Sequence, residues 1–82
     1  MRFIADYPFY TFMREYASNK VQMLRAESGI TQEQLAGYVG VSRQTIIAME
    51  KGNYTPSVLL ALKIAKHFRV PLEKIFTISY ER

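Results

Sequence analysis

The chain has 82 residues, of which 49% are apolar and 22% charged, so we expect one small globular domain rather than a disordered or repetitive chain. Eleven lysines and arginines against seven acidic residues give a formal net charge of +4, which favours a polyanionic partner. The absence of cysteine excludes disulfides and thiolate metal sites, and one histidine, His67, cannot form a histidine-rich site, so no metal or cofactor is expected. No window approaches the ~20 consecutive apolar residues of a membrane span, and the chain is expected to be soluble and cytoplasmic.

Residues 1–18 form an aromatic extension that holds six of the eleven aromatic side chains. Four of its residues recur at helical spacing: Phe9, Phe12, Met13 and Tyr16. Pro8 suits the first turn of a helix, so an additional amphipathic helix is predicted here. An apolar face of this size is typical of an association surface, and we expect it to build a homodimer contact together with Ile78 and Tyr80. The alternative is that it covers the core of its own subunit.

Residues 19–76 are predicted to form an all-α domain of five short helices. The first covers 19–28 and ends at Gly29, because glycine tolerates the left-handed conformation that follows many helices. Thr31 and Gln34 fit a capping box, in which each side chain accepts a hydrogen bond from the backbone amide of the other residue. The second helix therefore begins there, and Gly40 ends it.

The third helix is expected to start at the cap Ser42, to direct Ile46 and Met49 inward and to end near Lys51. Thr55 is predicted to cap the fourth helix, with Pro56 at its first position. The inner side of the fourth helix is assigned to four residues at helical spacing: Leu59, Leu62, Ala65 and Phe68.

A short fifth helix is expected to open around Pro71 and to bury Leu72, Ile75 and Phe76. The chain closes with the tail 77–82. From Phe76 to Tyr80 apolar and polar residues alternate, which predicts a short strand.

The second and third helices are joined by only about three residues, which forces a steep crossing between them. A small side chain is needed where their backbones approach, and Ala36 meets that need. Gly40 allows the left-handed turn, while Val41 and Ile46 fill the space between the helices. This order of small, glycine and apolar residues at fixed offsets predicts a helix-turn-helix.

Two stretches carry a family resemblance, LRAESGITQEQLAGYVGVSRQTI and MEKGNYTPSVLLALKIAKHFRVPLEKIF. From Leu24 to Phe76 the chain resembles the lambda-repressor-like, Cro/Xre-type helix-turn-helix domain of bacterial, phage and archaeal regulators. The resemblance implies a five-helix domain that binds operator DNA, usually as a dimer, and repression is the expected outcome. Two features depart from the family pattern, namely the aromatic extension and Ile47, where a polar residue is more usual.

With Ile46 and Met49 facing inward, the 100° step of a helix turns the opposite side of the third helix outward. We assign base contacts to five residues: Ser42, Arg43, Gln44, Ile47 and Ala48. Arg43 suits bidentate donation to guanine, Gln44 suits adenine, and the apolar side chains suit a thymine methyl. Two-fold symmetry would place this helix in successive major grooves of a palindromic site, with half-site centres about 34 to 36 Å apart.

Phosphate contacts are assigned to five further residues: Thr31, Gln32, Lys51, Asn53 and Tyr54. The first two lie at the amino end of the second helix, where free backbone amides attract anions. The alternative role for Lys51 is to compensate the dipole at the end of the third helix, and the two roles can coexist. The family resemblance implies a structural ion pair between Arg25 and Glu50.

No arrangement of nucleophile and base, and no glycine-rich phosphate loop, supports catalysis, so the chain is not expected to be an enzyme. Two alternatives share the fold. The first is an antitoxin or another protein-interaction module, which Ile47 and the aromatic extension would favour. The second is the controller protein of a restriction system, which its sequence does not separate from an ordinary repressor.

Overall fold

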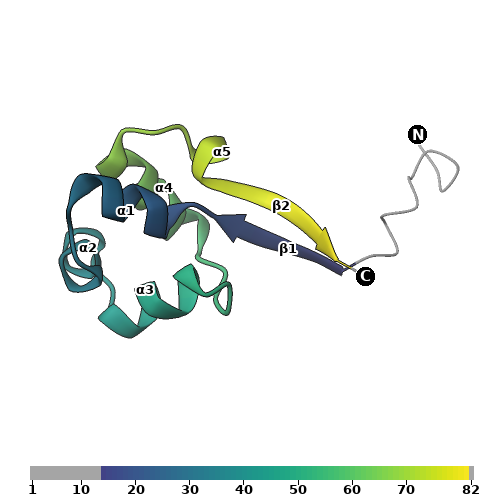
Figure 1. Cartoon of the computed structure of the whole chain (residues 1–82), viewed down its shortest axis with the longest axis horizontal. Coiled ribbons are helices and arrows are strands. Elements are labelled where there is room, and N and C mark those ends of the chain that lie inside the picture. The colour runs from purple at the N-terminus through teal and green to yellow at the C-terminus, as the bar shows by residue number, and fades with distance from the viewer. Residues whose placement is uncertain (1–13, 82) are drawn as a thin grey trace, which may run out of the picture.

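The computed structural model describes residues 14–81, which form a mostly helical domain with one two-stranded sheet (Figure 1). In chain order its elements are β1 (Arg14–Asn19), α1 (Val21–Ser28), α2 (Gln32–Val39), α3 (Arg43–Glu50), α4 (Val58–Phe68), α5 (Leu72–Ile75) and β2 (Phe76–Glu81). The helices pack around one another, and the two-stranded sheet of β1 and β2, which lie on either side of the five helices in the sequence, projects from them as an arm. None of the helices within this range is long and apolar enough to cross a membrane.

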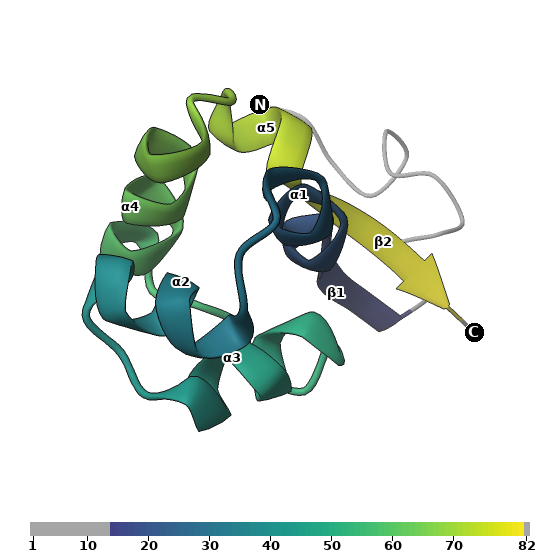
Figure 2. The ribbon, with the colours of Figure 1, turned by 60° about the vertical axis from the view of Figure 1, so that its left-hand side comes forward.

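The core lies between the five helices, which surround it as Figure 2 shows. Its largest fully buried side chains are Val21, Leu35, Ile46, Met49, Ile64 and Ile75. Each helix contributes at least one of them. Because no helix of four to eleven residues is stable alone in water, the helices depend on this shared apolar contact.

The predicted end of the first helix, both ends of the second and the start of the third are confirmed, but the first helix begins at Val21 and not at Asn19, which belongs to β1. Gly29 follows α1 in the left-handed conformation with φ of 70°. Thr31 Oγ1 accepts from the amide of Gln34 at 3.0 Å, and the Gln34 side chain accepts from the amide of Thr31 at 2.8 Å. Both halves of the capping box are thus formed. Ser42 caps α3 by accepting from the amide of Thr45 at 3.2 Å.

The strand predicted in the tail is present as β2, but its partner comes from the aromatic extension. Strand β1 pairs with β2 in antiparallel register, and Tyr16 lies opposite Ser79 and Ala17 opposite Ile78. The predicted amphipathic helix is therefore wrong at Tyr16, while its members Phe9, Phe12 and Met13 lie outside the described residues. Helical spacing is a local signal, and here long-range pairing with the chain end overrides it.

Helix α4 differs from prediction at its start. Its cap is Ser57, whose hydroxyl accepts from the amide of Leu60 at 3.1 Å, and not Thr55. Pro56 consequently precedes the helix instead of occupying its first position.

The buried side of α4 also differs. The structure buries Leu60, Ala61, Ile64 and Ala65, so of the predicted inner residues Ala65 is buried and Phe68 packs partly against the core, whereas Leu59 and Leu62 face solvent. The sequence VLLALKIA is apolar on almost every side of a helix, so spacing alone fits two stripes equally well.

Candidate nucleic-acid interface

The turn between α2 and α3 is built around Ala36 and Gly40. The Ala36 carbonyl accepts from the amides of both Gly40, at 2.8 Å, and Val41, at 3.0 Å. Gly40 adopts φ of 77°, which an L side chain adopts only with strain. Ala36 is buried, and its methyl group leaves room for α3 to pack against α2. The turn therefore fixes the position of α3 relative to the rest of the domain.

Helix α3 has one buried side and one open side. Ile46 and Met49 are fully buried. Arg43, Gln44 and Lys51 are exposed, as the sequence predicts, while Ile47 and Ala48 are half-buried between them. Part of the expected apolar surface is thus covered by the fold, and the open side carries mainly an arginine, an amide and a lysine.

Ser42 has a structural contact at the start of this helix. Its hydroxyl accepts from the Thr45 amide and lies 3.0 Å from the Thr45 hydroxyl. Thr45, which the sequence analysis does not assign, is therefore part of the same end of α3. Its side chain is half-buried. Its position directly after Gln44, at the exposed amino end of the helix, is the feature of the sequence that could have identified it.

A shielded polar network joins α1, α2 and α3, and its centre is Glu50. Arg25 Nε donates to Glu50 Oε2 at 2.8 Å, and Arg25 Nη2 donates to Glu50 Oε1 at 3.2 Å. Gln32 Nε2 donates to the same Oε1 at 3.0 Å. The Glu50 side chain is only 3% exposed and that of Arg25 16%. The expected ion pair is thus present, and it is bidentate.

Arg25 makes a third hydrogen bond, from Nη1 to the carbonyl of Ile30 at 3.0 Å. Its hydrogen bond to Glu50 raises the pKa of the guanidinium above its ordinary value, against the opposing effect of partial burial. The arginine therefore remains charged at every pH at which the domain would be studied.

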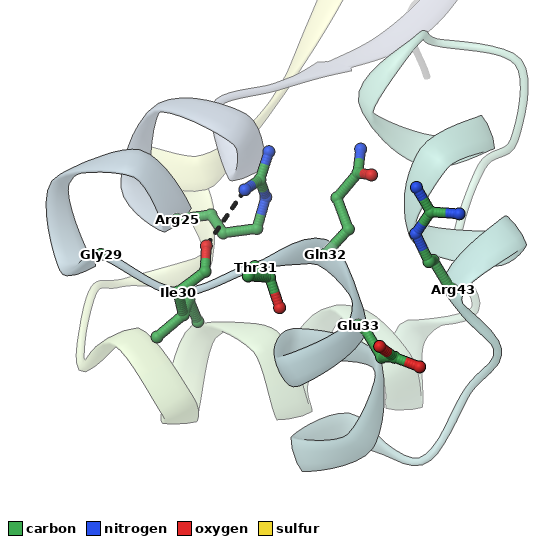
Figure 3. A pocket seen from close by; sticks show the side chains of 7 residues that line it. All are labelled: Arg25, Gly29, Ile30, Thr31, Gln32, Glu33 and Arg43. Carbon is green, nitrogen blue, oxygen red and sulfur yellow. Dashed lines mark hydrogen bonds between the residues drawn. The ribbon is translucent and has the colours of Figure 1, made fainter.

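An open pocket lies beside this network, between the start of α2 and the start of α3. Figure 3 shows the side chains of Gln32 and Arg43 projecting from their two helices toward the same opening, with Thr31 and Glu33 at its edge. The capping box occupies two of the first amides of α2 and leaves those of Gln32 and Glu33 without an intrahelical partner. An anionic oxygen entering here would meet backbone donors and the Arg43 guanidinium.

At the other end of α3 the chain turns away from the helix. The amide of Asn53 donates to the Ala48 carbonyl at 2.8 Å, which closes the last turn of the helix. Gly52 adopts φ of 80° within this turn. Lys51, Asn53 and Tyr54 are all exposed beyond it.

Two residues of β1 lie beside this end of α3, and the sequence analysis does not assign either of them. Arg14 and Tyr16 line one hollow together with Lys51 and Asn53, and the Arg14 guanidinium lies over the Tyr16 ring and pairs with Glu81. Asn19 attaches the end of β1 to α3, because its Nδ2 donates to the Met49 carbonyl at 2.9 Å. The local sequence does not predict that β1 contacts the end of α3, because this contact depends on the pairing of β1 with β2, which are far apart in the sequence.

Within residues 14–81 no group of three histidines or acidic residues is arranged to hold a metal ion. His67 stacks on Tyr38 with ring centroids 4.7 Å apart and meets the edge of Phe68 at 5.0 Å.

Comparisons with known proteins bear on this arrangement. Over 63 residues the chain is 54% identical to the HTH-type transcriptional regulator YgzD of Bacillus subtilis, covering 77% of this chain and 96% of that protein. An HTH-type transcriptional regulator of Methanocaldococcus jannaschii is 60% identical over 58 residues, which cover 71% of this chain and 88% of the relative.

A more distant relative is the transcriptional repressor RstR of the cryptic phage CTXphi of Vibrio cholerae, 36% identical over 76% of this chain and 56% of its own length. Among solved structures, the restriction-modification controller protein C.AhdI of Aeromonas hydrophila matches with a TM-score of 0.63 and 27% identity, covering 67% of this chain and 83% of that one.

The family model for the helix-turn-helix matches residues 21–75, which span all five helices. Together with the turn at Gly40 and the capped helix that follows it, this match shows that the chain belongs to the helix-turn-helix family.

Proposed function

We propose that the protein is a DNA-binding transcriptional regulator that inserts α3 into the major groove of duplex DNA. The observation that carries the proposal is the open side of α3, where Arg43 and Gln44 are exposed at the amino end of a helix whose other side is buried through Ile46 and Met49. Recognition helices of this class contact base edges mainly with their amino-terminal residues. The relatives named as transcriptional regulators support the same function.

In this proposal Arg43 and Gln44 are the principal base contacts. The arginine donates two parallel hydrogen bonds to guanine, and the glutamine pairs with adenine. Ala48 and the uncovered part of Ile47 contact thymine methyl groups. Ser42 contacts DNA only at the start of the helix, because its hydroxyl also holds the cap.

Phosphate contacts lie on both sides of the reading helix. Thr31 and Gln32 offer the amino end of α2, and Gln32 is held in place by its hydrogen bond to Glu50. Lys51, Asn53 and Tyr54 approach the backbone beyond the other end of α3. Arg14 extends this second group, since its hollow is shared with Lys51. Such contacts set affinity and register but carry no sequence information directly.

We further propose that the protein binds as a homodimer to a palindromic operator and represses transcription. The support is the name of RstR, a repressor, and the general match between two-fold protein symmetry and two-fold DNA sites. A formal charge of +4 speeds encounter with DNA at low ionic strength.

The test separates a base contact from a phosphate contact on an operator selected from random duplexes. Arg43→Ala should weaken binding by ~1 to 3 kcal/mol and relax preference at one base pair. Lys51→Ala should weaken all duplexes alike and lower the salt slope by about one. Lys74→Ala removes the same charge from an exposed position of α5, a helix that lies across the domain from α3 in Figure 1, and is the matched control. Equal losses on every duplex for Arg43→Ala would contradict the assigned base contact.

The likeness to C.AhdI supports a second candidate, a controller protein of a restriction-modification system. Such a protein would use the same DNA contacts and differ in its target. The genes beside the coding sequence discriminate the two, because a controller is expected next to a restriction enzyme and a methyltransferase.

A further inference from the structure

The sheet of β1 and β2 has two chemically different faces. Directly opposed residues share a face, and successive residues of a strand alternate between the faces. One face carries six polar side chains: Arg14, Tyr16, Ser18, Thr77, Ser79 and Glu81. We call it the hydroxyl face, because four of the six end in a hydroxyl group. On the other face, Ala17 and Phe76 line an apolar hollow with Val58 and Leu72, so that face turns toward α4 and α5.

The hydroxyl face lies beside the carboxyl end of α3. Arg14 and Tyr16 line a hollow of ≈ 260 Å³ together with Lys51 and Asn53, which follow that helix. The hydrogen bond from Asn19 to α3 attaches the sheet at the same place. In Figure 1 the sheet slopes away from the helices until its outer end lies at about the level of α3. The hydroxyl face therefore continues the surface that begins at the open side of α3.

The side chains of this face are those that contact nucleic-acid backbones. Ser18 Oγ lies 2.9 Å from Thr77 Oγ1 and 2.8 Å from Ser79 Oγ, so the three hydroxyl groups form one cluster. In protein–DNA complexes, arginine guanidinium groups and the hydroxyls of serine, threonine and tyrosine bind phosphate and sugar oxygens. A guanidinium carries five N–H donors, so Arg14 can hold Glu81 and a phosphate oxygen at the same time.

The charges around the hollow also suit an anion. Arg14 and Lys51 supply two positive charges, and Glu81 supplies one negative charge. The remaining acidic residue of the sheet, Glu15, lies on the opposite face, because it pairs with Tyr80. The face beside α3 thus has a net positive charge, although the whole sheet carries two glutamates.

The length of the sheet decides how much DNA it can follow. Six residues at about 3.3 Å each span roughly 20 Å, and base pairs are spaced 3.4 Å apart along the duplex, so the sheet matches about six base pairs. We propose that the hydroxyl face binds the sugar–phosphate backbone outside the base pairs that α3 reads. This inference rests on the proposed function and adds a second contacting element that lengthens the binding site without adding sequence preference.

The experiment compares two duplexes. The short one ends at the operator selected from random duplexes, and the long one adds six base pairs of arbitrary sequence at each end. The full-length wild type should bind the long duplex about 3- to 10-fold more tightly, and its salt slope should be larger by about one. Arg14→Ala should remove both differences. Lys63→Ala removes the same charge from an exposed position of α4 and should keep them.

Two glutamates at the outer end of the sheet provide a sharper comparison. Glu81→Gln and Glu15→Gln remove the same charge from opposite faces. Glu81→Gln should raise affinity for the long duplex by about 3- to 10-fold and leave the short duplex unchanged within about twofold. Glu15→Gln should change neither. Circular dichroism and urea unfolding check that each variant keeps the fold.

Equal affinity of the wild type for both duplexes would overturn the inference and leave the DNA-reading role of α3 in place. Equal effects of Glu81→Gln and Glu15→Gln would also overturn it, because they would indicate a general effect of charge and not contact by one face. A preference among different flanking sequences would show that the sheet reads bases, contrary to the backbone contact proposed here. A wild type that binds no selected duplex would refute the proposed function as well.

Discussion

Replacing Arg25 by methionine tests the network that fixes α3. Methionine keeps much of the apolar stem but removes the guanidinium, so both hydrogen bonds to Glu50 and the one to the Ile30 carbonyl are lost. The Glu50 side chain, 3% exposed, then retains Gln32 Nε2 as its partner. Removing one member of a buried pair costs ~3 to 5 kcal/mol, and the remaining amide favours the lower end of that range.

This loss is large for so small a domain. Stabilities of roughly 0.05 to 0.15 kcal/mol per residue correspond to about 4 to 12 kcal/mol for the whole chain. We therefore expect Arg25→Met to lower the urea midpoint sharply, followed by circular dichroism, with an unchanged m-value. The double variant Arg25→Met, Glu50→Met should recover most of the loss, because it leaves no buried unpaired carboxylate.

The pH dependence of the stability that this ion pair contributes follows from the direction in which the pKa of Arg25 is shifted. The folded-state pKa of Arg25 is raised above its ordinary value by the hydrogen bond to Glu50. The stabilisation is therefore complete below the unfolded-state pKa and is lost only in strong alkali, so titration of Arg25 adds no slope between about pH 6 and pH 9.

A destabilisation by Arg25→Met of less than ~0.5 kcal/mol, as at an ordinary surface site, would refute the reasoning. So would a double variant as unstable as the single one.

Further predictions concern the turn at Gly40, the cap of α3 and the β1–β2 sheet. Gly40→Ala should destabilise the domain by roughly 1 to 2 kcal/mol in the same unfolding assay, because φ of 77° strains any residue with a Cβ; an unchanged midpoint would contradict this. Ser42→Ala should cost ~0.5 to 2 kcal/mol through loss of the cap, and Ser42→Asp, which can restore it, should recover most of that stability. Arg14→Ala should lower the salt slope of DNA binding by about one, whereas Glu81→Gln should strengthen binding by removing a negative charge from the same hollow. If salt titrations show no change for either variant, the β1–β2 sheet does not contact DNA.

The helix boundaries near α3 follow from local chemistry. Gly29 and Gly40 end helices because the left-handed conformation suits glycine, and Thr31 and Ser42 begin them because their hydroxyls satisfy amides only three residues away. These interactions join residues close in sequence, so the sequence identifies them. The outward direction of Arg43 and Gln44 follows in the same way, from the helical offset to Ile46 and Met49.

The sequence thus determined by itself the helix-turn-helix, the caps of α2 and α3 and the outward direction of Arg43 and Gln44, because each depends on neighbours within about one helical turn. Only the tertiary structure decided that residues 14–19 pair with the chain end, that Arg14 lies beside Lys51, and that Leu59 and Leu62 face outward. In α4 two apolar stripes compete, and in β1 a helical spacing competes with a strand. Contacts between distant residues settle both choices, since burial against the other helices favours one stripe, and hydrogen bonding to β2 favours the strand.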